Sequence, residues 1–358
     1  MIEQALEGEL ASAEVIAGTS EGREVMFLAG LYRAGQAIAD RLLRLREGRL
    51  SWPTIDSERA IPWAEGRTGL ELSPSQREAM RLALVSKICV ITGAPGVGKT
   101  TLVNSILKIL AAKRVVMALA APTGRAAKRL AESSGMEAIT LHRLLETDPA
   151  EGGFKRNEHN PLECQLLVTD EASMIDVMLM QATPKALPPG ATLLLVGDVD
   201  QLPSVGAGQV LKDVIASGAV PVVRLTDVFR QAATSRIITG AHRINAGEMP
   251  DLSARGEGDF FYVDAEEPGN VAEKVVDLVP RHIPRRFGFE PACDIRVLGP
   301  MQRGGAGARA LNTLLQQRIN PPNDQFVERF GHRYSPCDKV MHIPRTASGT
   351  STTAILAS

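Results

Sequence analysis

Five short apolar segments alternate with helical ones between residues 69 and 228, and they constrain the fold more than any other feature. Each segment is rich in Val, Leu or Ile and does not alternate with polar residues, which is typical of strands buried on both faces of a parallel sheet. Strands that alternate with helices predict an α/β domain, doubly wound, over residues 69–228. The expected strands are residues 87–93, 114–122, 164–172, 191–198 and 220–227.

The segment before this domain has a different pattern. Apolar residues at helical spacing in residues 24–45 predict a short helical N-terminal region over residues 1–68. A packed helix with a solvated, arginine-rich face explains that pattern without any functional role.

The segment after this domain reads as a second, partial α/β domain over residues 229–342. Its expected strands are residues 259–265 and 294–301, and its expected helices are residues 268–283 and 307–320. Residues 343–358 are rich in Ser, Thr and Ala without an acidic residue, and we expect them to be disordered or aberrant.

Composition excludes several classes of protein. Lys and Arg number 40 against 41 Asp and Glu, so a surface that binds nucleic acid must be local rather than general. The 4 cysteines are widely separated, which indicates neither a metal site nor a disulfide framework and favours a reducing cytoplasm. No apolar run approaches the ~20 residues that a membrane helix needs, so no membrane partner is expected.

Residues 93–100, GAPGVGKT, fit the pattern G-x-x-x-x-G-K-[ST] and follow the first expected strand directly. Glycines let such a loop curl until its backbone N–H groups face phosphate oxygens. Lys99 then reaches the β- and γ-phosphates and the Thr100 hydroxyl binds Mg²⁺, so ATP and Mg²⁺ are the expected cofactors. The expected nucleotide contacts in this loop are Gly93, Ala94, Pro95, Gly96, Val97, Gly98, Lys99, Thr100 and Thr101.

Two further strands end in polar residues at the same expected sheet edge. After residues 164–169 come Asp170, which suits a Mg²⁺ ligand through water, and Glu171, which suits a base for the attacking water. In a doubly wound sheet, ligands lie outside the carboxyl ends of the strands. Alone, the Asp-Glu pair is weak evidence for an ATP-hydrolysing site. Together with the glycine-rich loop, it is strong evidence for one.

The sequence GDVDQLPSVG, residues 197–206, ends the other strand. Gln201 is the candidate to contact a γ-phosphate or its water, and Asp198 and Asp200 are candidates to hold the loop. In isolation, a turn stabilised by Asp and Pro explains these residues equally well.

These motifs, taken in order, resemble those of the RecD-like DNA helicases of superfamily 1, whose branch moves 5′-to-3′. The glycine-rich loop, the Asp-Glu pair and GDVDQLPSVG resemble the family's motifs I, II and III. Other matching segments are LSPSQREAM (72–80), APTGRAAKRL (121–130), TLHRLL (140–145), LTDVFRQ (225–231) and VLGPMQRGGAGARALN (297–312).

The resemblance implies a P-loop NTPase with a RecA-like parallel sheet and a partial second RecA-like domain. It also implies that Gln76 reads the adenine and that Arg230 acts as an arginine finger from the second domain. The implied partners are single-stranded DNA, a duplex fork and proteins of recombination or repair, in the cytoplasm and at the bacterial nucleoid. The DNA contacts that it implies are Pro122, Thr123, Gly124, Arg125, His142 and Phe154, the last in a small β-hairpin insert near residues 147–164.

The sequence also departs from the family. Motifs V and VI, expected after residue 340, are not found, and only residues 1–68 precede the first motif. We therefore expect a core truncated at both ends, with a tail altered by a frameshift or truncation, that binds ATP and hydrolyses it weakly.

Three functions stay open from the sequence. The first is an ATP-dependent DNA helicase or translocase acting in DNA repair or recombination. The second is a truncated module that binds ATP and DNA without unwinding. The third is a P-loop kinase or other NTPase unrelated to DNA, which the order of the motifs argues against.

Overall fold

The computed structural model describes residues 8–20, 22–150, 152–227, 234–253, 258–321, 324–329, 331–341 and 355–356. The chain divides into two compact units, Met1–Phe260 and Phe261–Ser358. The boundary near residue 228 that the sequence suggested stays a prediction, because residues 228–233 lie outside the described part.

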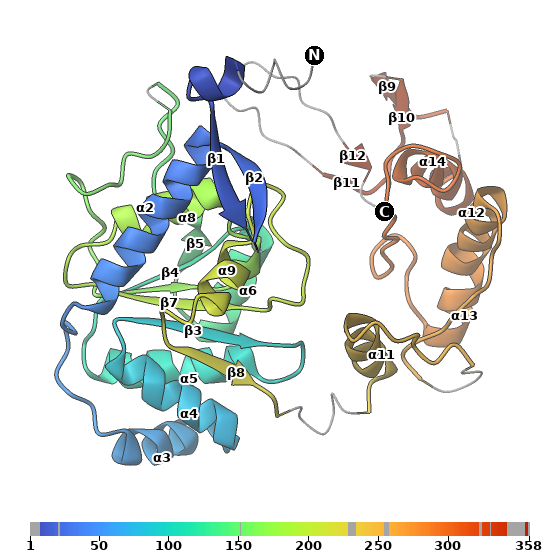
Figure 1. Ribbon diagram of the computed structural model, residues 1–358. Helices are drawn as coiled ribbons and strands as arrows, with labels where there is room; N and C mark the ends of the chain where they lie inside the picture. The colour runs from blue at the N-terminus through green and yellow to red at the C-terminus, as the bar shows by residue number, and fades with distance from the viewer. Residues whose placement is uncertain are drawn as a thin grey trace. The chain divides into compact units, whose positions relative to one another are not determined.

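A six-stranded parallel sheet organises the first unit, in the order β5-β4-β6-β7-β3-β8 (Figure 1). All five strands predicted from the apolar segments are present, as β3, β4, β6, β7 and β8. The edge strand β5 was not predicted, because its three half-buried residues form no apolar run. The strands are β3 (Ile88–Gly93), β4 (Met117–Ala121), β5 (Ala138–Thr140), β6 (Leu166–Thr169), β7 (Thr192–Gly197) and β8 (Val222–Leu225).

Helices cover both faces of this sheet, as the lack of alternation in the strands predicted. Cys89 and Ile91 of β3 belong to one apolar cluster, whereas Ile88 and Val90 belong to the other. Successive side chains of a strand point to opposite faces, so the two clusters are the two layers of the core. The first layer includes α3 (Ser57–Thr68), α4 (Pro74–Val85), α5 (Lys99–Ala112) and α6 (Gly124–Ser134), and the second includes α2 (Ala29–Arg46), α8 (Val177–Lys185) and α9 (Val210–Ala216).

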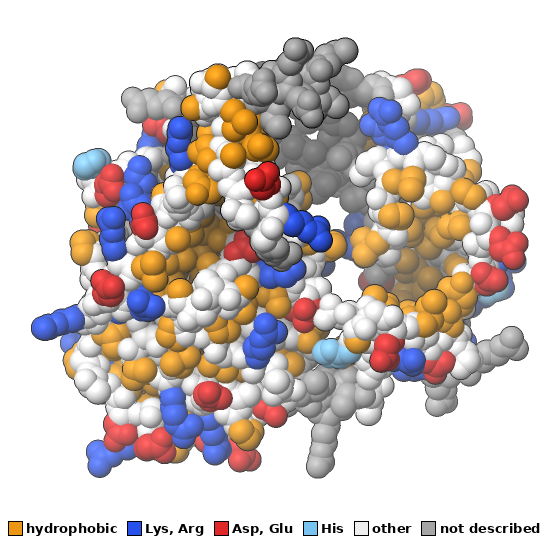
Figure 2. Space-filling view, in the orientation of Figure 1, with side chains coloured by type: hydrophobic (Ala, Val, Ile, Leu, Met, Phe, Trp, Pro, Cys, Tyr) orange, Lys and Arg blue, Asp and Glu red, His pale blue; other side chains and the backbone are white. Residues whose placement is uncertain are grey.

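An antiparallel ribbon precedes the helices of the N-terminal region. It consists of β1 (Val15–Ser20) and β2 (Arg23–Leu28), joined at Gly22, whose positive φ of 75° suits a tight turn. The prediction that helical spacing begins at residue 24 is therefore wrong for residues 24–28, where alternation along β2 prevails. Figure 2 shows hydrophobic side chains gathered on this ribbon, and Met26 and Leu28 are among the exposed ones.

The second unit is mainly helical. The helices predicted at 268–283 and 307–320 are confirmed as α12 (Pro268–Asp277), continued by η2 (Leu278–His282) and α13 (Ile283–Phe287), and as α14 (Ala308–Ile319). Its described strands are the short antiparallel pairs β9 (Val327–Arg329) with β10 (His332–Tyr334), and β11 (Val340–Met341) with β12 (Ile355–Leu356).

The strands predicted at 259–265 and 294–301 are wrong, because neither segment pairs with another strand. Tyr262 and Leu298 instead expose 52% and 92% of their surfaces, so apolar composition alone misled the prediction. Other described helices of the chain are α7 (Leu141–Leu144), the 3₁₀ turn η1 (Ala172–Met174) and α11 (Arg236–Asn245). None of the helices described is long and apolar enough to cross a membrane.

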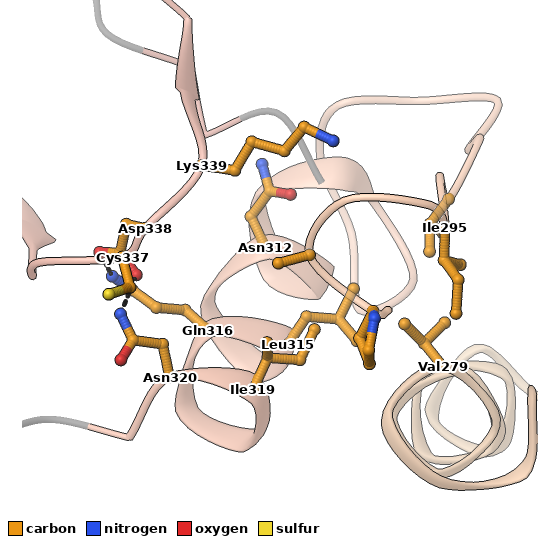
Figure 3. Close-up of a pocket in the computed structure, with 13 residues that line it drawn as sticks. Val279, Ile295, Asn312, Leu315, Gln316, Ile319, Asn320, Cys337, Asp338 and Lys339 are labelled. Carbon is orange, nitrogen blue, oxygen red and sulfur yellow. Dashed lines mark hydrogen bonds between the residues drawn. The ribbon is translucent and has the colours of Figure 1, made fainter. Parts of the chain in front are cut away.

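A small cavity of about 60 Å³ lies beside α14 in the second unit (Figure 3). Asp338 closes its rim by accepting hydrogen bonds from Gln316 Nε2 at 2.5 Å and Asn320 Nδ2 at 2.8 Å. Val279 and Leu315 line its apolar part. Its size suits one or two water molecules rather than a cofactor, and none of the predicted site residues lines it.

Candidate functional site

The loop between β3 and α5 has the conformation that an anion-binding loop needs. Gly96 and Gly98 have φ angles of 83° and 75°, in the left-handed region that favours glycine. At Gly93 a Cβ atom would lie 2.8 Å from Val97 Cγ2, so no larger residue fits there. The 14-residue helix α5 begins at Lys99, and its first backbone N–H groups have no partner within the helix. The loop therefore presents backbone N–H donors to an anion at the edge of the sheet where the parallel strands end.

The Lys99 ammonium lies over this loop. It donates hydrogen bonds to the carbonyl oxygens of Gly93 and Ala94, the latter at 3.3 Å. Its Nζ is also 3.9 Å from Oδ2 of Asp198, a carboxylate that exposes only 1% of its surface. A buried carboxylate near the ammonium keeps that positive charge at the sheet edge.

Asp198 also orders the loop after β7. Its Oδ2 accepts a hydrogen bond from Gln201 Nε2 at 3.0 Å, and its Oδ1 accepts one from the Asp200 N–H at 3.1 Å. The sequence suggested Asp198 and Asp200 together for this task. In the described part, Asp198 supplies the carboxylate and Asp200 supplies only its backbone N–H, with its own side chain exposed.

Asp170 and Glu171 follow β6 at the same edge. Asp170 Oδ1 accepts a hydrogen bond from the Glu171 N–H at 2.9 Å. Burial raises the pKa of Asp170, although that hydrogen bond and the charges of Lys99 and Arg129 oppose the change. Burial and then the negative charge of Asp170 raise the pKa of Glu171.

One oxygen of Glu171, Oε2, is buried without a hydrogen-bond partner among the described residues. Burying a carboxylate oxygen without a hydrogen-bond donor costs free energy. Its position therefore suits a donor that enters with a ligand, such as a water molecule. The backbone of Glu171 is itself left-handed, with φ of 53°, which is unusual for a residue with a side chain.

Residues of the glycine-rich loop, the Asp-Glu pair and Gln201 line one hollow of about 700 Å³ in the first unit. This volume is within the range of small-molecule sites. The predicted residues that the hollow brings together are Ala94, Pro95, Gly96, Gly98, Lys99, Thr100, Asp170, Glu171 and Gln201. Gly93, Val97 and Thr101 belong to the same loop and helix start but do not line it.

The hollow also fits Mg²⁺. The Thr100 hydroxyl and the Asp170 carboxylate are the oxygen ligands that this ion prefers. The described residues hold no cluster of three or more His, Cys, Asp or Glu that could bind a metal ion alone. The donor set therefore suits an ion shared between protein, phosphates and water, which is the usual way of binding Mg²⁺.

Helix α6 supplies the far wall of the hollow, which sequence reasoning missed. Arg129 lies there with Ala126 and Leu130, and its charge acts on both Asp170 and Glu171. The resemblance assigned the residues just before it, Pro122 to Arg125, to DNA. The available signal was the spacing, because Ala126, Arg129 and Leu130 recur at three- and four-residue intervals on one helix face.

Gln76 lies in the first turn of α4 and is fully buried. Its Nε2 donates hydrogen bonds to the Val97 carbonyl at 3.1 Å and to the Gly98 carbonyl at 3.2 Å. Its Oε1 accepts one from the Ser73 N–H at 3.0 Å. The carboxamide that the resemblance assigned to the adenine thus contacts the glycine-rich loop.

The loops after β6 and β7 are packed together. Val177, at the start of α8, donates its N–H to the Ala207 carbonyl at 3.0 Å. A Cβ atom on Gly206 would overlap the Asp176 carboxylate, and one on Gly208 would overlap the Val177 side chain. There is therefore no room for a side chain between these loops at Gly206 or Gly208.

The residues predicted to contact DNA lie in two places. Pro122, Thr123, Gly124 and Arg125 follow β4, and Thr123 caps α6 by accepting a hydrogen bond from the Ala126 N–H at 3.3 Å. Gly124 and Arg125 are exposed.

His142 and Phe154 lie near each other, with ring centroids 5.9 Å apart. His142 is exposed, whereas Phe154 is half-buried and packs against the core. The predicted insert turns back on itself at Gly152 and Gly153, which both have positive φ, and one antiparallel bridge joins Thr147 to Phe154. Arg230 lies outside the described residues.

The face in view in Figure 2 carries no continuous basic field, since blue and red side chains are interspersed over it. This agrees with the net charge of −1. On this face, the charges therefore form no general basic surface.

The chain is similar in sequence to known proteins. A family model described as an AAA domain matches residues 76–207. The chain is 37% identical over 308 residues to the "ATP-dependent RecD2 DNA helicase" of Deinococcus radiodurans, which covers 85% of this chain and 40% of that protein. It is 35% identical over 272 residues to the "RecBCD enzyme subunit RecD" of Mycobacterium tuberculosis, covering 68% of this chain and 46% of that protein. The chain thus spans less than half the length of these two relatives.

Among solved structures, the chain is similar to the Pif1 helicase from Candida albicans, with 27% identity and a TM-score of 0.42. The match covers 51% of this chain and 45% of that one. A second, a Bacteroides Pif1 in complex with ADP-AlF4, has 25% identity and a TM-score of 0.30, and covers 45% of this chain and 43% of that one. The six parallel strands themselves show the α/β fold.

Proposed function

Since the chain belongs by sequence to the RecD-like helicases, we propose that it hydrolyses ATP and couples hydrolysis to movement on single-stranded DNA. Movement 5′-to-3′ and duplex unwinding in DNA repair or recombination are part of the proposal. One observation carries it: Lys99, Asp170, Glu171 and Gln201 line a single hollow at the carboxyl edge of the sheet.

Each group in the hollow has a separate role in the hydrolysis of ATP. The loop N–H groups and the Lys99 ammonium bind and orient the phosphates. Thr100 and, through water, Asp170 would hold Mg²⁺, which would neutralise phosphate charge. Glu171 Oε2, buried and without a partner among the described residues, accepts a proton from the attacking water. Gln201 orients that water, and Arg230 contributes positive charge from beyond β8.

Helix α6 connects this hollow to the expected DNA contacts. Thr123, Gly124 and Arg125 form its start, while Ala126 and Arg129 line the hollow within the next turn or two. One rigid helix thus carries groups expected to contact the phosphates of the nucleotide and groups expected to contact the phosphates of DNA. This arrangement supports a coupling between the state of the nucleotide and the affinity for DNA.

We predict that Arg125→Ala weakens the binding of single-stranded DNA and lowers the dependence of binding on salt by about one phosphate contact. Arg125 is exposed at the start of α6 and lies outside the lining of the hollow, so ATP affinity should not change. Fluorescence anisotropy of a labelled oligonucleotide, measured over a series of salt concentrations, gives both quantities.

Lys128→Ala is the matched control, because Lys128 is exposed on the same helix and lies 3.7 Å from Glu132. Its removal should change the affinity and the salt slope less than the removal of Arg125. Equal slopes for the wild type and both variants would contradict the assignment of Arg125 to the DNA.

The proposed partners are single-stranded DNA, a duplex fork and proteins of repair or recombination, met in the cytoplasm and at the bacterial nucleoid. The length of DNA bound and the polarity of movement follow from the same labelled oligonucleotides when they carry single-stranded 5′ or 3′ tails.

A further inference from the structure

We propose that a second hollow of the first unit, here named the Lys87 hollow, binds a phosphate-bearing ligand. It lies at the end of β3 opposite the glycine-rich loop, and it shares no lining residue with the hollow that Lys99 lines. The proposal therefore goes beyond ATP hydrolysis and does not depend on it.

The side chain of Lys87 is buried without a carboxylate partner among the described residues. Lys87 directly precedes β3 and exposes only 4% of its surface. Its ammonium donates hydrogen bonds to the carbonyl oxygens of Gly190, at 2.7 Å, and Ala191. Burial lowers the pKa of Lys87, and no carboxylate of the described residues opposes this change. Since buried charges in proteins are paired as a rule, an ammonium with a third N–H donor suits an anion from outside the chain.

The Lys87 hollow has a volume of about 550 Å³, within the range of small-molecule sites. Three cations line it, Arg46, Arg49 and Lys87, together with the hydroxyl residues Thr54 and Ser86. No Asp or Glu of the described residues lines it. Three positive charges favour an anion with more than one negative charge, and guanidinium groups match the geometry of phosphate oxygens.

Both arginines keep donors for such an anion. Arg46 donates one hydrogen bond, to the Ala219 carbonyl at 2.8 Å, and a guanidinium has five N–H donors. Arg49 is exposed, and neither an ion pair nor a side-chain hydrogen bond joins it to the described residues. Between them, a Cβ atom on Gly48 would lie 3.0 Å from Lys87 Cε, so a side chain at this position would crowd Lys87.

An alternative is that the cations only balance the ends of two helices. Helices α2 and α4 end beside the Lys87 hollow, at Arg46 and Val85. The carbonyl end of a helix carries roughly half a negative charge, so two ends balance about one of the three cations. An excess of positive charge remains, which favours the ligand over this alternative.

Trp52 provides a local probe, because it lines the Lys87 hollow. The chain has 2 tryptophans, and the other, Trp63, is exposed and does not line the hollow. Trp63→Phe therefore leaves Trp52 as the source of tryptophan emission. Lys87 and Gly93 lie at opposite ends of β3, about 20 Å apart at the usual rise of a strand, so Trp52 does not report on the glycine-rich loop.

The experiment titrates inorganic tripolyphosphate, and in parallel a short oligothymidylate, into the full chain carrying Trp63→Phe, at constant ionic strength. Binding should change the emission of Trp52. Arg49→Ala should weaken this binding by about 10-fold, because it removes one charge-assisted contact. Arg44→Ala is the matched control, since Arg44 is exposed in the last turn of α2 and lies outside the Lys87 hollow, and it should change the affinity little.

The two probes distinguish the sources of the phosphate. An Arg49-dependent response to tripolyphosphate alone identifies a free phosphate compound, whereas such a response to the oligonucleotide identifies the phosphates of DNA. Equal weakening by Arg44→Ala and Arg49→Ala would show a general effect of charge and overturn the proposal. So would the absence of Arg49-dependent binding of either probe, both in Trp52 emission and in equilibrium dialysis.

Two further variants separate the proposals. Lys87→Met, similar in length but uncharged, should remove the Arg49-dependent response, and a variant that melts normally and binds like the parent would overturn the proposal. Lys99→Ala acts on the proposed ATP site and should leave the Trp52 titration unchanged. Loss of the Trp52 response in Lys99→Ala would assign the signal to the ATP site and also overturn the proposal, whereas failure of ATP hydrolysis alone would leave it standing.

Discussion

Lys99→Ala is expected to lower the rate of ATP hydrolysis by about 10³-fold, because it removes the ammonium that stabilises charge on the transferred phosphoryl group. Among the described residues, Lys99 and Arg129 are the cations that line the hollow, and Lys99 is the one on the glycine-rich loop. Steady-state release of phosphate at saturating ATP measures the rate.

The fold should survive this substitution, since the Lys99 side chain contacts loop carbonyls and Asp198 rather than the apolar core. Lys108→Ala, exposed on the same helix α5, is the matched control and should hydrolyse ATP like the wild type. A Lys99→Ala protein that melts normally and still hydrolyses ATP at the wild-type rate would refute the assignment of this loop.

Glu171→Gln should reduce hydrolysis by about 10²-fold or more while leaving ATP binding intact or tighter. The amide keeps the size of the side chain but no longer accepts a proton readily. It also removes the negative charge of a carboxyl group whose pKa is raised in the wild type, first by burial and then by the charges of Asp170 and Asp198. Single-turnover hydrolysis and equilibrium binding of a fluorescent ATP analogue separate the two effects.

Asp200→Asn provides the comparison for Glu171→Gln. Asp200 is an exposed carboxylate on the neighbouring loop and does not line the hollow. Its substitution should change the rate little. If Glu171→Gln retained a normal single-turnover rate, another group would have to accept the proton.

The sheet and the loop could be predicted because local sequence determines both. The strands β3, β6 and β7 are apolar runs that burial on both faces explains, whereas the edge strand β8 exposes Arg224. The strand β3 ends at Gly93, the first residue of the loop. The side chains of Asp170, Glu171 and Gln201 then meet because the carboxyl ends of parallel strands share an edge.

Other features depend on tertiary contacts that the sequence does not reveal. The segments at 259–265 and 294–301 have the composition of strands but no neighbouring strand to pair with. The carboxamide of Gln76 finds loop carbonyls 21 and 22 residues away in sequence. Spacing places Arg129 on one face of α6 with Ala126 and Leu130, but that this face lines the hollow depends on the packing of α6 beside α5, which the sequence does not reveal.

The central claim is that this sheet edge hydrolyses ATP in response to single-stranded DNA. The most direct test is ATP hydrolysis by the 358-residue chain with and without a single-stranded oligonucleotide, with Lys99→Ala as the blank. We expect a rate above the blank that rises when DNA is added. A rate equal to the blank in both conditions, or one that DNA leaves unchanged, would contradict it.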